Sequence, residues 1–433
     1  MGKNTEPGDY VEVHLMKTIY EGVLLEVPKS EKGIVLLKLD SGYNIGFNKK
    51  EVSYIKVLKK AKEKLEEVKI EKDSKKPDVA MVITGGTIAS KLDPKTGAVK
   101  WLDTPESLFK IYPELFEKVN ISKVKIPFMK GSENMDFKDW KKIAKVVQKL
   151  LNEMHTKGVI ITHGTDSLHY TSAALSFFLG KVNKPVVLTY SQRSIDRASS
   201  DASLNLQCAA LAAISDIAEV MIVGHASSND DFCYAMSGTK VRKLHSSRRD
   251  AFKVVNSKPF AKISKDTIHK LSDYNVRNKS HSGYPKTLNK GAKIKADLSF
   301  EDKVALLKFY PGQNPDILDY YFKKKYKGVV IEMMGLGHVA AKESNLSWTK
   351  KLKEVIEKGL VVCAAAQTIY GRLDPLVYST GRELLNTGII YLEDMLAETA
   401  LVKLGFVLGH PDWNVKEKML ENISGEFNDR LEG

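Results

Sequence analysis

The stretch from Val79 to Ser90 constrains the fold of this chain more than any other. Five apolar residues, Val79-Ala80-Met81-Val82-Ile83, end abruptly in Thr84-Gly85-Gly86-Thr87. Such a run predicts a parallel strand buried on both faces, followed by a tight turn at its carboxyl end, where open α/β sheets bind their ligands. Glycines allow close approach of a ligand and offer N–H groups to negative charge, and the hydroxyl of Thr87 is the candidate nucleophile. An ordinary strand-to-loop turn explains the same residues, whereas a phosphate loop is excluded because no Gly-Lys-Ser/Thr follows.

A second strand delivers polar side chains to a turn of the same kind. Residues 158–162 are apolar or β-branched and run into His163-Gly164-Thr165-Asp166-Ser167. Two turns at the carboxyl ends of parallel strands can face each other across one crevice. A threonine nucleophile needs a base, and an amine with a depressed pKa suits that role better than Asp166 does, so Lys240 is the candidate. The structural alternatives are that Thr165 and Asp166 cap a helix and that Lys240 is one of 67 basic residues.

From Val79 onward, predicted strands alternate with predicted helices, which is typical of a parallel sheet covered on both faces. Residues 137–151 carry apolar side chains at helical spacing, and a second α/β unit begins near Lys303. Residues 8–58 alternate with the short period of strands and contain turn residues between the runs, which predicts a small five-stranded, SH3-like β-barrel. The expected division is a barrel (1–60), a charged linker (61–77), a first α/β domain (78–275), a basic connector (276–302) and a second α/β domain (303–433).

The composition favours a globular protein of a reducing compartment. The chain is 43% apolar and 28% charged, and no apolar run approaches the roughly 20 residues of a membrane-spanning helix. Residues 1–9 are polar, so we expect no secretion signal and a cytoplasmic location. Three cysteines lie far apart without metal-ligand spacing, and we expect no metal in this chain.

Positive charge is concentrated in one part of the sequence. The net charge is +14, and residues 240–295 hold sixteen Lys and Arg against three acidic residues. A solvated, lysine-rich connector accounts for this stretch. The alternative is a surface that faces a polyanion or an acidic partner subunit.

Taken together, the two threonine turns resemble those of the asparaginase/glutaminase amidohydrolases, and so do Gly381-Arg382-Glu383-Leu384 and Glu393-Asp394-Met395. The resemblance covers about the last four-fifths of the chain and implies a two-domain, parallel-sheet amidohydrolase of the α/β class. It implies that Thr87 is the primary nucleophile and that a relay consists of Thr165, Asp166 and Lys240. It also implies that Ser132 and Glu133, with Gly86 beside them, hold the α-amino and α-carboxylate groups of the substrate.

Within this family the chain resembles the D subunits of archaeal glutamyl-tRNA(Gln) amidotransferases. The resemblance rests on Gln192–Arg197, His245–Phe252, Gly335-Leu336-Gly337-His338 and the small β-barrel. It implies that glutamine is hydrolysed and that ammonia passes to an E subunit, which amidates glutamate on tRNA(Gln). ATP and Mg are then expected on that partner and not on this chain, within a D2E2 heterotetramer that contains a homodimer of D. Secreted asparaginases carry a tyrosine in the loop after the nucleophile, but residues 97–101 have none, and its role is left unassigned.

Two other functions remain open on the sequence. One is a stand-alone cytosolic L-asparaginase, which uses the same chemistry without a partner. The other is an RNA-binding protein whose amidohydrolase portion is inert. Which threonine attacks first, and whether residues 240–295 touch tRNA or the E subunit, are also open.

Overall fold

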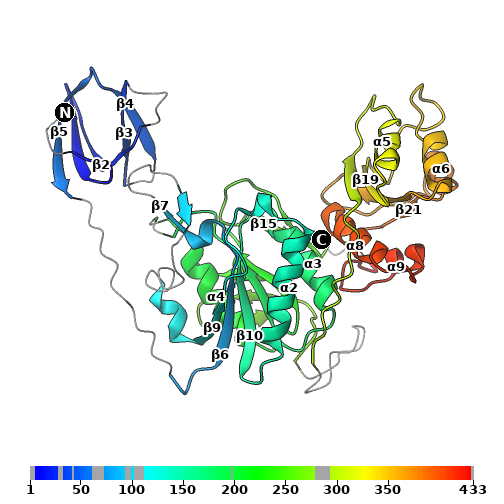
Figure 1. The fold of residues 1–433 in the computed structure, drawn as a ribbon, viewed down its shortest axis with the longest axis horizontal. Coiled ribbons are helices and arrows are strands. Elements are labelled where there is room, and N and C mark those ends of the chain that lie inside the picture. The colour runs from blue at the N-terminus through cyan, green and yellow to red at the C-terminus, as the bar shows by residue number, and fades with distance from the viewer. Residues whose placement is uncertain are drawn as a thin grey trace.

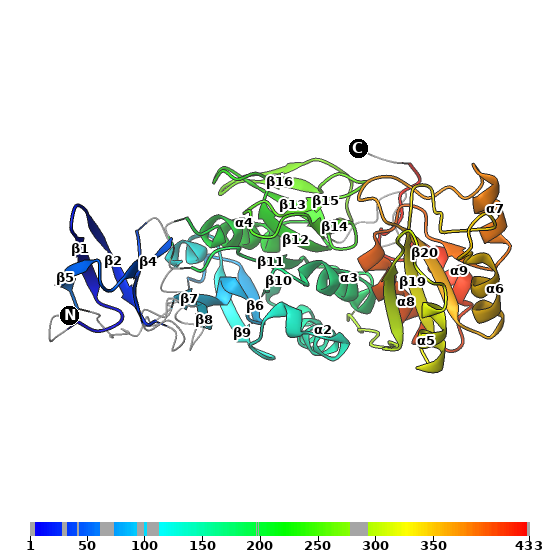
Figure 2. The same cartoon turned by 90° about the horizontal axis from the view of Figure 1, so that it is seen from above.

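The computed structural model describes residues 5–27, 33–40, 43–60, 73–92, 99–101, 112–195, 197, 199–277 and 293–430. Figures 1 and 2 show three units in a row, with a small β unit at one end, a larger α/β unit in the middle and a smaller α/β unit at the other end. Residues 61–72 of the predicted linker and 278–292 of the predicted connector lie outside the described residues. The other residues of both segments are described.

The N-terminal unit is an antiparallel sheet, which confirms the prediction of a small five-stranded β unit. Its strands follow the order β4-β3-β2-β1-β5. Alternate side chains such as Val11, Val13 and Leu37 fill its interior. The strands are β1 (Tyr10–Leu15), β2 (Ile19–Leu25), β3 (Ile34–Lys38), β4 (Asn44–Asn48) and β5 (Val52–Lys59).

The central unit is built on an eight-stranded sheet of order β17-β16-β13-β12-β11-β10-β6-β9. Five strands are parallel: β6 (Asp78–Ile83), β9 (Asn120–Lys125), β10 (Thr156–Thr162), β11 (Val186–Thr189) and β12 (Val220–His225). Three more continue the sheet in antiparallel fashion: β13 (Cys233–Ser237), β16 (Ala261–Ile263) and β17 (Ile268–Lys270). The second parallel strand in the chain lies on one side of β6 and the third on the other. The direction of winding therefore switches between β6 and β10, and such a switch creates a crevice at the carboxyl ends of the strands.

Helices cover both faces of this sheet. They are required because the apolar side chains of β6 point alternately to the two faces. Val79, Met81 and Ile83 pack into a core shared with α4 (Ala202–Ile214), whereas Ala80 and Val82 pack into the core of the opposite face. That opposite face carries α2 (Phe137–Leu151) and α3 (Leu168–Leu179). The predicted helix at 137–151 is confirmed, and Asp136 and Asp139 begin it with a capping box.

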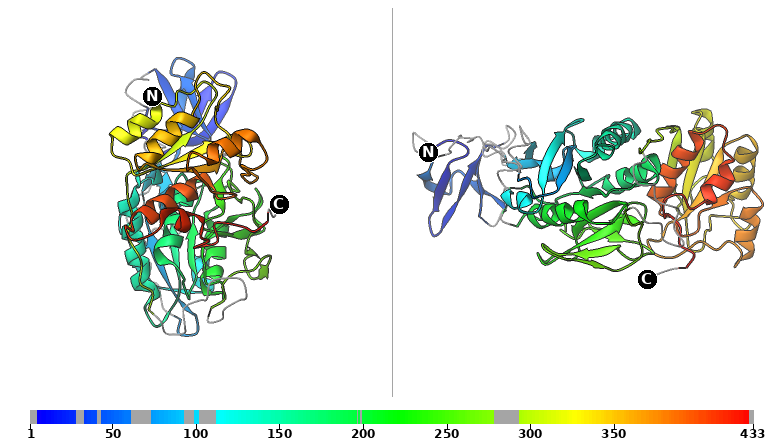
Figure 3. Two further views of the ribbon diagram at one scale, coloured as in Figure 1. Left: turned by 90° about the vertical axis from the view of Figure 1, so that its right-hand side faces the viewer. Right: turned by 90° about the horizontal axis from the view of Figure 1, so that it is seen from below.

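The C-terminal unit is a four-stranded parallel sheet, β18-β19-β20-β21. Its strands are β18 (Val304–Lys308), β19 (Gly328–Met333), β20 (Val361–Ala366) and β21 (Ile390–Tyr391). Its helices are α5 (Ile317–Lys323), α6 (Thr349–Glu357), α7 (Ser379–Leu385), α8 (Ala397–Leu408) and α9 (Val415–Leu420). Helix α8 lies between this sheet and α3 of the central unit (Figures 2 and 3). Its Leu404 packs with Val330, and its Phe406 stacks on Phe177 at 5.8 Å.

Residues 240–277 are folded, so their interpretation as a connector is wrong. They contain β16 and β17 and a hairpin made by β14 (Val241–Lys243) and β15 (Phe252–Val254). A second short hairpin, β7 (Ser90–Leu92) with β8 (Val99–Trp101), follows the turn after β6. No helix of the described ranges is both long and apolar enough to cross a membrane.

Candidate active site

The turns that follow β6 and β10 touch each other through their backbones. Gly86 has φ +81°, and a Cβ added to it would overlap the Cα of Gly164. Because Gly86 lacks a side chain, the two turns can approach this closely, and a Cβ on Gly164 would overlap Oγ of Ser132 in the turn after β9. Thr87 and Thr165 each follow one of these touching glycines, so the structure brings both predicted hydroxyl residues to the crevice between β6 and β10.

A third turn, after β9, completes the crevice. A Cβ on Gly85, whose φ is +110°, would overlap the carbonyl oxygen of Lys130, and the Lys130 N–H donates to the carbonyl of Thr84 at 3.2 Å. The Lys130 ammonium pairs with the buried Asp139 of α2 at 2.6 Å. The Thr84 hydroxyl donates to the carbonyl of Thr162 at 2.9 Å. This hydrogen bond joins the end of β6 to β10 and uses the proton of the Thr84 hydroxyl.

Ser132 lies in this third turn and joins it to the second threonine motif. Its hydroxyl oxygen accepts hydrogen bonds from the N–H groups of Asp166 (3.0 Å) and Ser167 (3.3 Å), and its carbonyl accepts from the Ser167 hydroxyl at 2.6 Å. The side chain is buried. Because a hydroxyl has two acceptor positions and one proton, both acceptor positions are used and the proton is free for donation.

Glu133, the other predicted substrate contact, is exposed. Its carboxylate accepts from the side-chain amide of Asn134 at 3.0 Å and lies where a Cβ on Gly131 would be. The side chain therefore folds over the turn that carries Ser132. Its contact with a substrate stays a prediction.

The lysine that contacts Thr165 and Asp166 is Lys243, three residues after the predicted one. Its ammonium donates to Oγ1 of Thr165 and to Oδ1 of Asp166, both at 2.8 Å. Thr165 is buried and Lys243 is largely buried, whereas the Asp166 side chain is 64% exposed. A hydroxyl, a carboxylate and an amine therefore lie in contact beside the turn that carries Thr87.

The assignment of Lys240 to this relay is wrong. Its ammonium pairs with Oδ2 of Asp394 at 2.6 Å and donates to the Asp394 carbonyl at 3.1 Å, and both side chains are fully buried. Burial lowers the pKa of Lys240, although the carboxylate of Asp394 opposes the shift. The Lys240 amine is therefore paired with the carboxylate of Asp394 in the C-terminal unit and does not contact Thr165.

Sequence reasoning missed Lys243 because the two lysines are only three positions apart in the chain. The spacing to Thr165 and Asp166 suits either lysine. Only the position of Asp394, an acid 154 residues beyond Lys240, distinguishes them. The available signal was the presence of a second lysine three residues after Lys240, at the end of β14.

Two histidines near the crevice are neutral. Burial lowers the pKa of His163 to about 4, and its ring contacts the carbonyl of Gly164 at 2.7 Å and the hydroxyl of Thr171 at 2.9 Å. Burial and the charge of Arg242 lower the pKa of His169 to about 3. These rings act as fixed polar groups at neutral pH.

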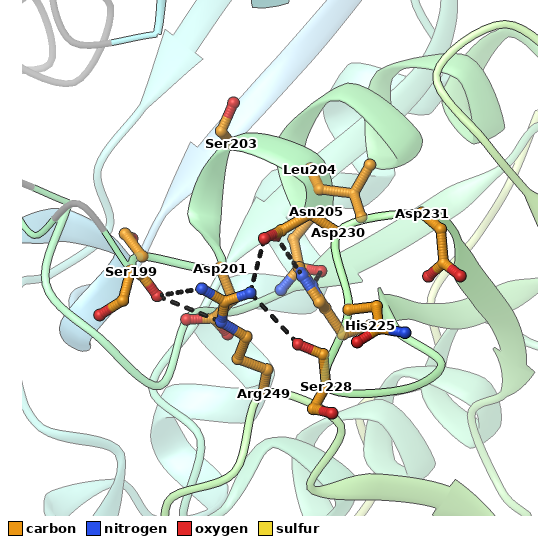
Figure 4. Close-up of polar contacts among 12 residues, drawn as sticks. Ser199, Asp201, Ser203, Leu204, Asn205, His225, Ser228, Asp230, Asp231 and Arg249 are labelled. Atoms are coloured by element: carbon orange, nitrogen blue, oxygen red, sulfur yellow. Dashed lines mark hydrogen bonds and ion pairs between the residues drawn. The ribbon is translucent and has the colours of Figure 1, made fainter.

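Arg249, from the segment His245–Phe252, lies in a polar network with Ser199, Asp230 and His225 (Figure 4). Arg249 donates to the Ser199 carbonyl at 2.8 Å and pairs with Asp230 at 2.6 Å. His225, fully buried, contacts Asp230 at 3.0 Å and Asn205 at 2.6 Å. Arg249 therefore cross-links segments within the central unit and is not a free surface cation.

Comparison with known protein families agrees with this geometry. Residues 5–58 match the GatD N-terminal domain, residues 78–275 match the asparaginase N-terminal domain, and residues 303–419 match the glutaminase/asparaginase C-terminal domain. The glutamyl-tRNA(Gln) amidotransferase D subunit of Pyrococcus furiosus is 44% identical over 98% of this chain and 95% of its own length. The chain belongs to the family of amidotransferase D subunits.

Other relatives support this membership. The glutamyl-tRNA(Gln) amidotransferase D subunit of Thermococcus kodakarensis is 46% identical over 94% of this chain and 90% of its own length. Among solved structures, the thermostable L-asparaginase of Thermococcus kodakarensis superposes with a TM-score of 0.68 at 28% identity, over 81% of this chain and 99% of the asparaginase. The predicted two-domain asparaginase fold preceded by an antiparallel β unit is confirmed.

Proposed function

We propose that this chain is the glutaminase component of a tRNA-dependent amidotransferase, which releases ammonia from glutamine for the conversion of Glu-tRNA(Gln) to Gln-tRNA(Gln). The observation that carries the proposal is the contact of Lys243 with Thr165 and Asp166 beside the turn that holds Thr87. Membership in the family of amidotransferase D subunits over nearly the whole chain supports the choice of glutamine.

The proposed chemistry is acyl transfer through a threonine ester. The Thr87 oxygen attacks the side-chain amide carbon of glutamine, and its proton leaves through the network of Thr165, Asp166 and Lys243. N–H groups of the two glycine turns stabilise the oxyanion, and one such donor is worth about 2.7–4 kcal/mol. The carbon–nitrogen bond then breaks, and the leaving nitrogen takes up a proton and departs as ammonia. Water hydrolyses the ester, which releases glutamate and restores the Thr87 hydroxyl.

Substrate binding is assigned to the turn after β9. The free proton of Ser132 is directed to the α-carboxylate, and the carboxylate of Glu133 is placed to attract the α-ammonium group. Gly86 allows the substrate to approach the β6 turn closely. Ser132 and Glu133 would select a substrate with free α-carboxylate and α-ammonium groups.

The ammonia is proposed to pass to an E-type partner subunit that binds tRNA(Gln), and ATP and Mg are assigned to that partner. A homodimer of this chain within a D2E2 heterotetramer is part of the proposal. Exposed apolar side chains support an interface in the C-terminal unit, because Tyr370, Leu376, Val377 and Tyr378 lie on one loop between β20 and α7 and are each more than half exposed. Exposed apolar residues that gather in this way are typical of interaction sites. A cytoplasmic location stays a prediction.

A stand-alone L-asparaginase is the second candidate, favoured by the likeness of the two α/β units to solved L-asparaginases. The N-terminal β unit argues against it, since the asparaginase of Thermococcus kodakarensis covers only 81% of this chain. An RNA-binding protein with an inert amidohydrolase fold is opposed by the intact contact of Lys243 with Thr165 and Asp166.

The proposal is tested by steady-state kinetics of the purified chain alone and together with a co-expressed E-type partner and Glu-tRNA(Gln). We expect glutamine to be hydrolysed with a higher kcat/KM than asparagine, and Thr87→Ala to remove the activity while the circular-dichroism spectrum stays unchanged. A preference for asparagine would favour the stand-alone enzyme. Full activity of Thr87→Ala would remove that residue from the mechanism.

A further inference from the structure

Residues just before Lys243, in and next to strand β14, contact the C-terminal unit. Nε of Arg242 lies 3.0 Å from Oε1 of Glu398 and forms an ion pair with it, and Lys240 pairs with Asp394 at 2.6 Å. Glu398 lies in the first turn of α8 and Asp394 lies three residues before that helix begins. Two basic side chains of residues 240–242 therefore form ion pairs with two acidic side chains at or just before the start of α8.

These contacts are buried. The Asp394 and Glu398 side chains are 0% and 8% exposed. The hydroxyl of Thr399 adds a third link, because it donates to the Thr239 carbonyl at 2.8 Å. Buried ion pairs with additional hydrogen bonds hold their partners in one arrangement, since breaking one partner leaves an uncompensated charge.

The hairpin itself is short. β14 has three residues, and it pairs with β15 through Val241, Arg242 and Lys243. A two-stranded ribbon of this length has little stability of its own. Its position relative to Thr165 and Asp166 therefore depends on contacts with its surroundings. Phe252 of β15 is buried against Tyr190 of the central unit, and residues 239–242 contact the start of α8.

We propose that Asp394 and Glu398 are positioning residues for Lys243, so that the C-terminal unit sets the lysine amine against Thr165 and Asp166. The inference rests on the proposed glutaminase function for its kinetic consequences. Neither acid touches the substrate, and both act through the strand that bears Lys243. A displacement of about 1 Å in a catalytic group can cost roughly 100-fold in rate.

Of the two acids, Glu398 allows the more specific test. Its carboxylate contacts Arg242 directly, and the neutral ring of His169 lies 3.9 Å away. Its second oxygen, Oε2, is buried without a hydrogen-bond partner among the described residues. The orientation of the carboxylate is therefore set mainly by Arg242, and Glu398→Gln removes the charge while it keeps the shape.

The experiment compares Glu398→Gln, Arg242→Met and Arg242→Lys with the wild-type chain in kcat, KM for glutamine and Tm. We expect Glu398→Gln and Arg242→Met to lower kcat about 10- to 100-fold while KM changes less than about twofold, because the turn of Ser132 is untouched. Arg242→Lys keeps a cation beside Glu398 and should recover most of the lost kcat.

Asp297→Asn is the matched control. Asp297 pairs with His410, which follows the opposite end of α8, at 2.7 Å, so this variant also removes one acid that holds the helix. It should lower Tm without lowering kcat. A wild-type kcat in Glu398→Gln, or equal losses of kcat in Glu398→Gln and Asp297→Asn, would overturn the inference.

A second readout does not depend on the reaction. The rate of acetylation of Lys243 by acetic anhydride, followed by peptide mass spectrometry, should rise several-fold in Glu398→Gln because the amine leaves Thr165 and Asp166. It should stay at the wild-type rate in Asp297→Asn. If the wild-type chain does not hydrolyse glutamine, the proposed function fails, whereas the acetylation rates still decide whether Glu398 positions Lys243.

Discussion

Gly86 packs against the backbone of Gly164, so that position 86 has no room for a side chain, and a Cβ on Gly164 would in turn overlap Oγ of Ser132. This single approach joins the turn that carries Thr87 to the turn that carries Thr165. Gly86 also has φ +81°, a conformation that residues with a Cβ rarely adopt. The geometry of the proposed nucleophile and relay therefore depends on two missing methyl groups.

Gly86→Ala should unfold more easily and lose activity. The added Cβ meets the backbone of Gly164, which cannot move aside without opening the crevice, and we expect a loss of at least ~2 kcal/mol in the free energy of unfolding. Gly312→Ala is the matched control, because Gly312 has φ +83° with nothing within 4 Å of an added Cβ. Denaturant titration should show a smaller loss of about 1 kcal/mol there and unchanged turnover.

Lys243→Met and Lys240→Met should differ in kind. Loss of the Lys243 amine should lower kcat by about 10²–10⁴-fold with little change in Tm, since the hydrogen bonds that this amine makes to the described residues go to Thr165 and Asp166. Lys240→Met leaves Asp394 buried without its cation, and should cost about 3–5 kcal/mol of stability as well as a smaller part of kcat, because the pair helps to position Lys243. Equal losses of activity and equal Tm values in the two variants would contradict this division of roles.

Ser132→Ala should impair both binding and stability. Without the hydroxyl, the N–H groups of Asp166 and Ser167 lose their acceptor, which costs about 1–3 kcal/mol. The KM for glutamine should also rise. Ser215→Ala removes a hydroxyl that accepts from the N–H of Ile217, before β12 and away from the carboxyl ends of the strands, so kinetic assays should show a change of KM for Ser132→Ala alone.

Acidification should destabilise the chain through His163. The folded pKa is about 4 and the ordinary value is 6.5, so the unfolded chain binds more protons between these values. Stability from this group is complete above pH 6.5 and falls as the pH drops to 4, by about 3 kcal/mol. Burial raises the pKa of Glu219 to about 7, which has the opposite effect between pH 4.5 and 7. The difference between wild type and His163→Gln in unfolding titrations isolates the histidine, and parallel pH curves would refute its contribution.

Arg249→Glu should destabilise the fold and not only a partner interface. Arg249 is largely buried and pairs with Asp230. A glutamate at this position would be repelled by the Asp230 carboxylate and could not donate a hydrogen bond to the Ser199 carbonyl. We expect a loss of about 2 kcal/mol by thermal unfolding. Lys265→Glu makes the same charge change at an exposed position and should leave Tm unchanged. Weakened co-purification with an E-type partner in Lys265→Glu would identify residues 240–277 as the partner-facing surface.

The sequence predicted the elements whose patterns are long and regular. The buried run of β6 and the apolar spacing of α2 each determine one structure, and the two glycines after β6 could be interpreted as positions where the backbone closely approaches another group. The hairpin β14–β15 could not be predicted, because three-residue strands are too short to show a period. The choice between Lys240 and Lys243 failed for a related reason, since it depends on Asp394, which belongs to another unit of the fold.

Helix α8 completes two cores at once, and this affects the order in which the chain can fold. Phe177 and Phe178 of α3 are buried partly by Phe406 of α8. Because synthesis proceeds from the amino terminus, the central unit leaves the ribosome with this aromatic face uncovered until residues 397–408 emerge. The nascent chain would therefore be open to chaperone binding at α3, and the two α/β units would reach their native state as one cooperative body.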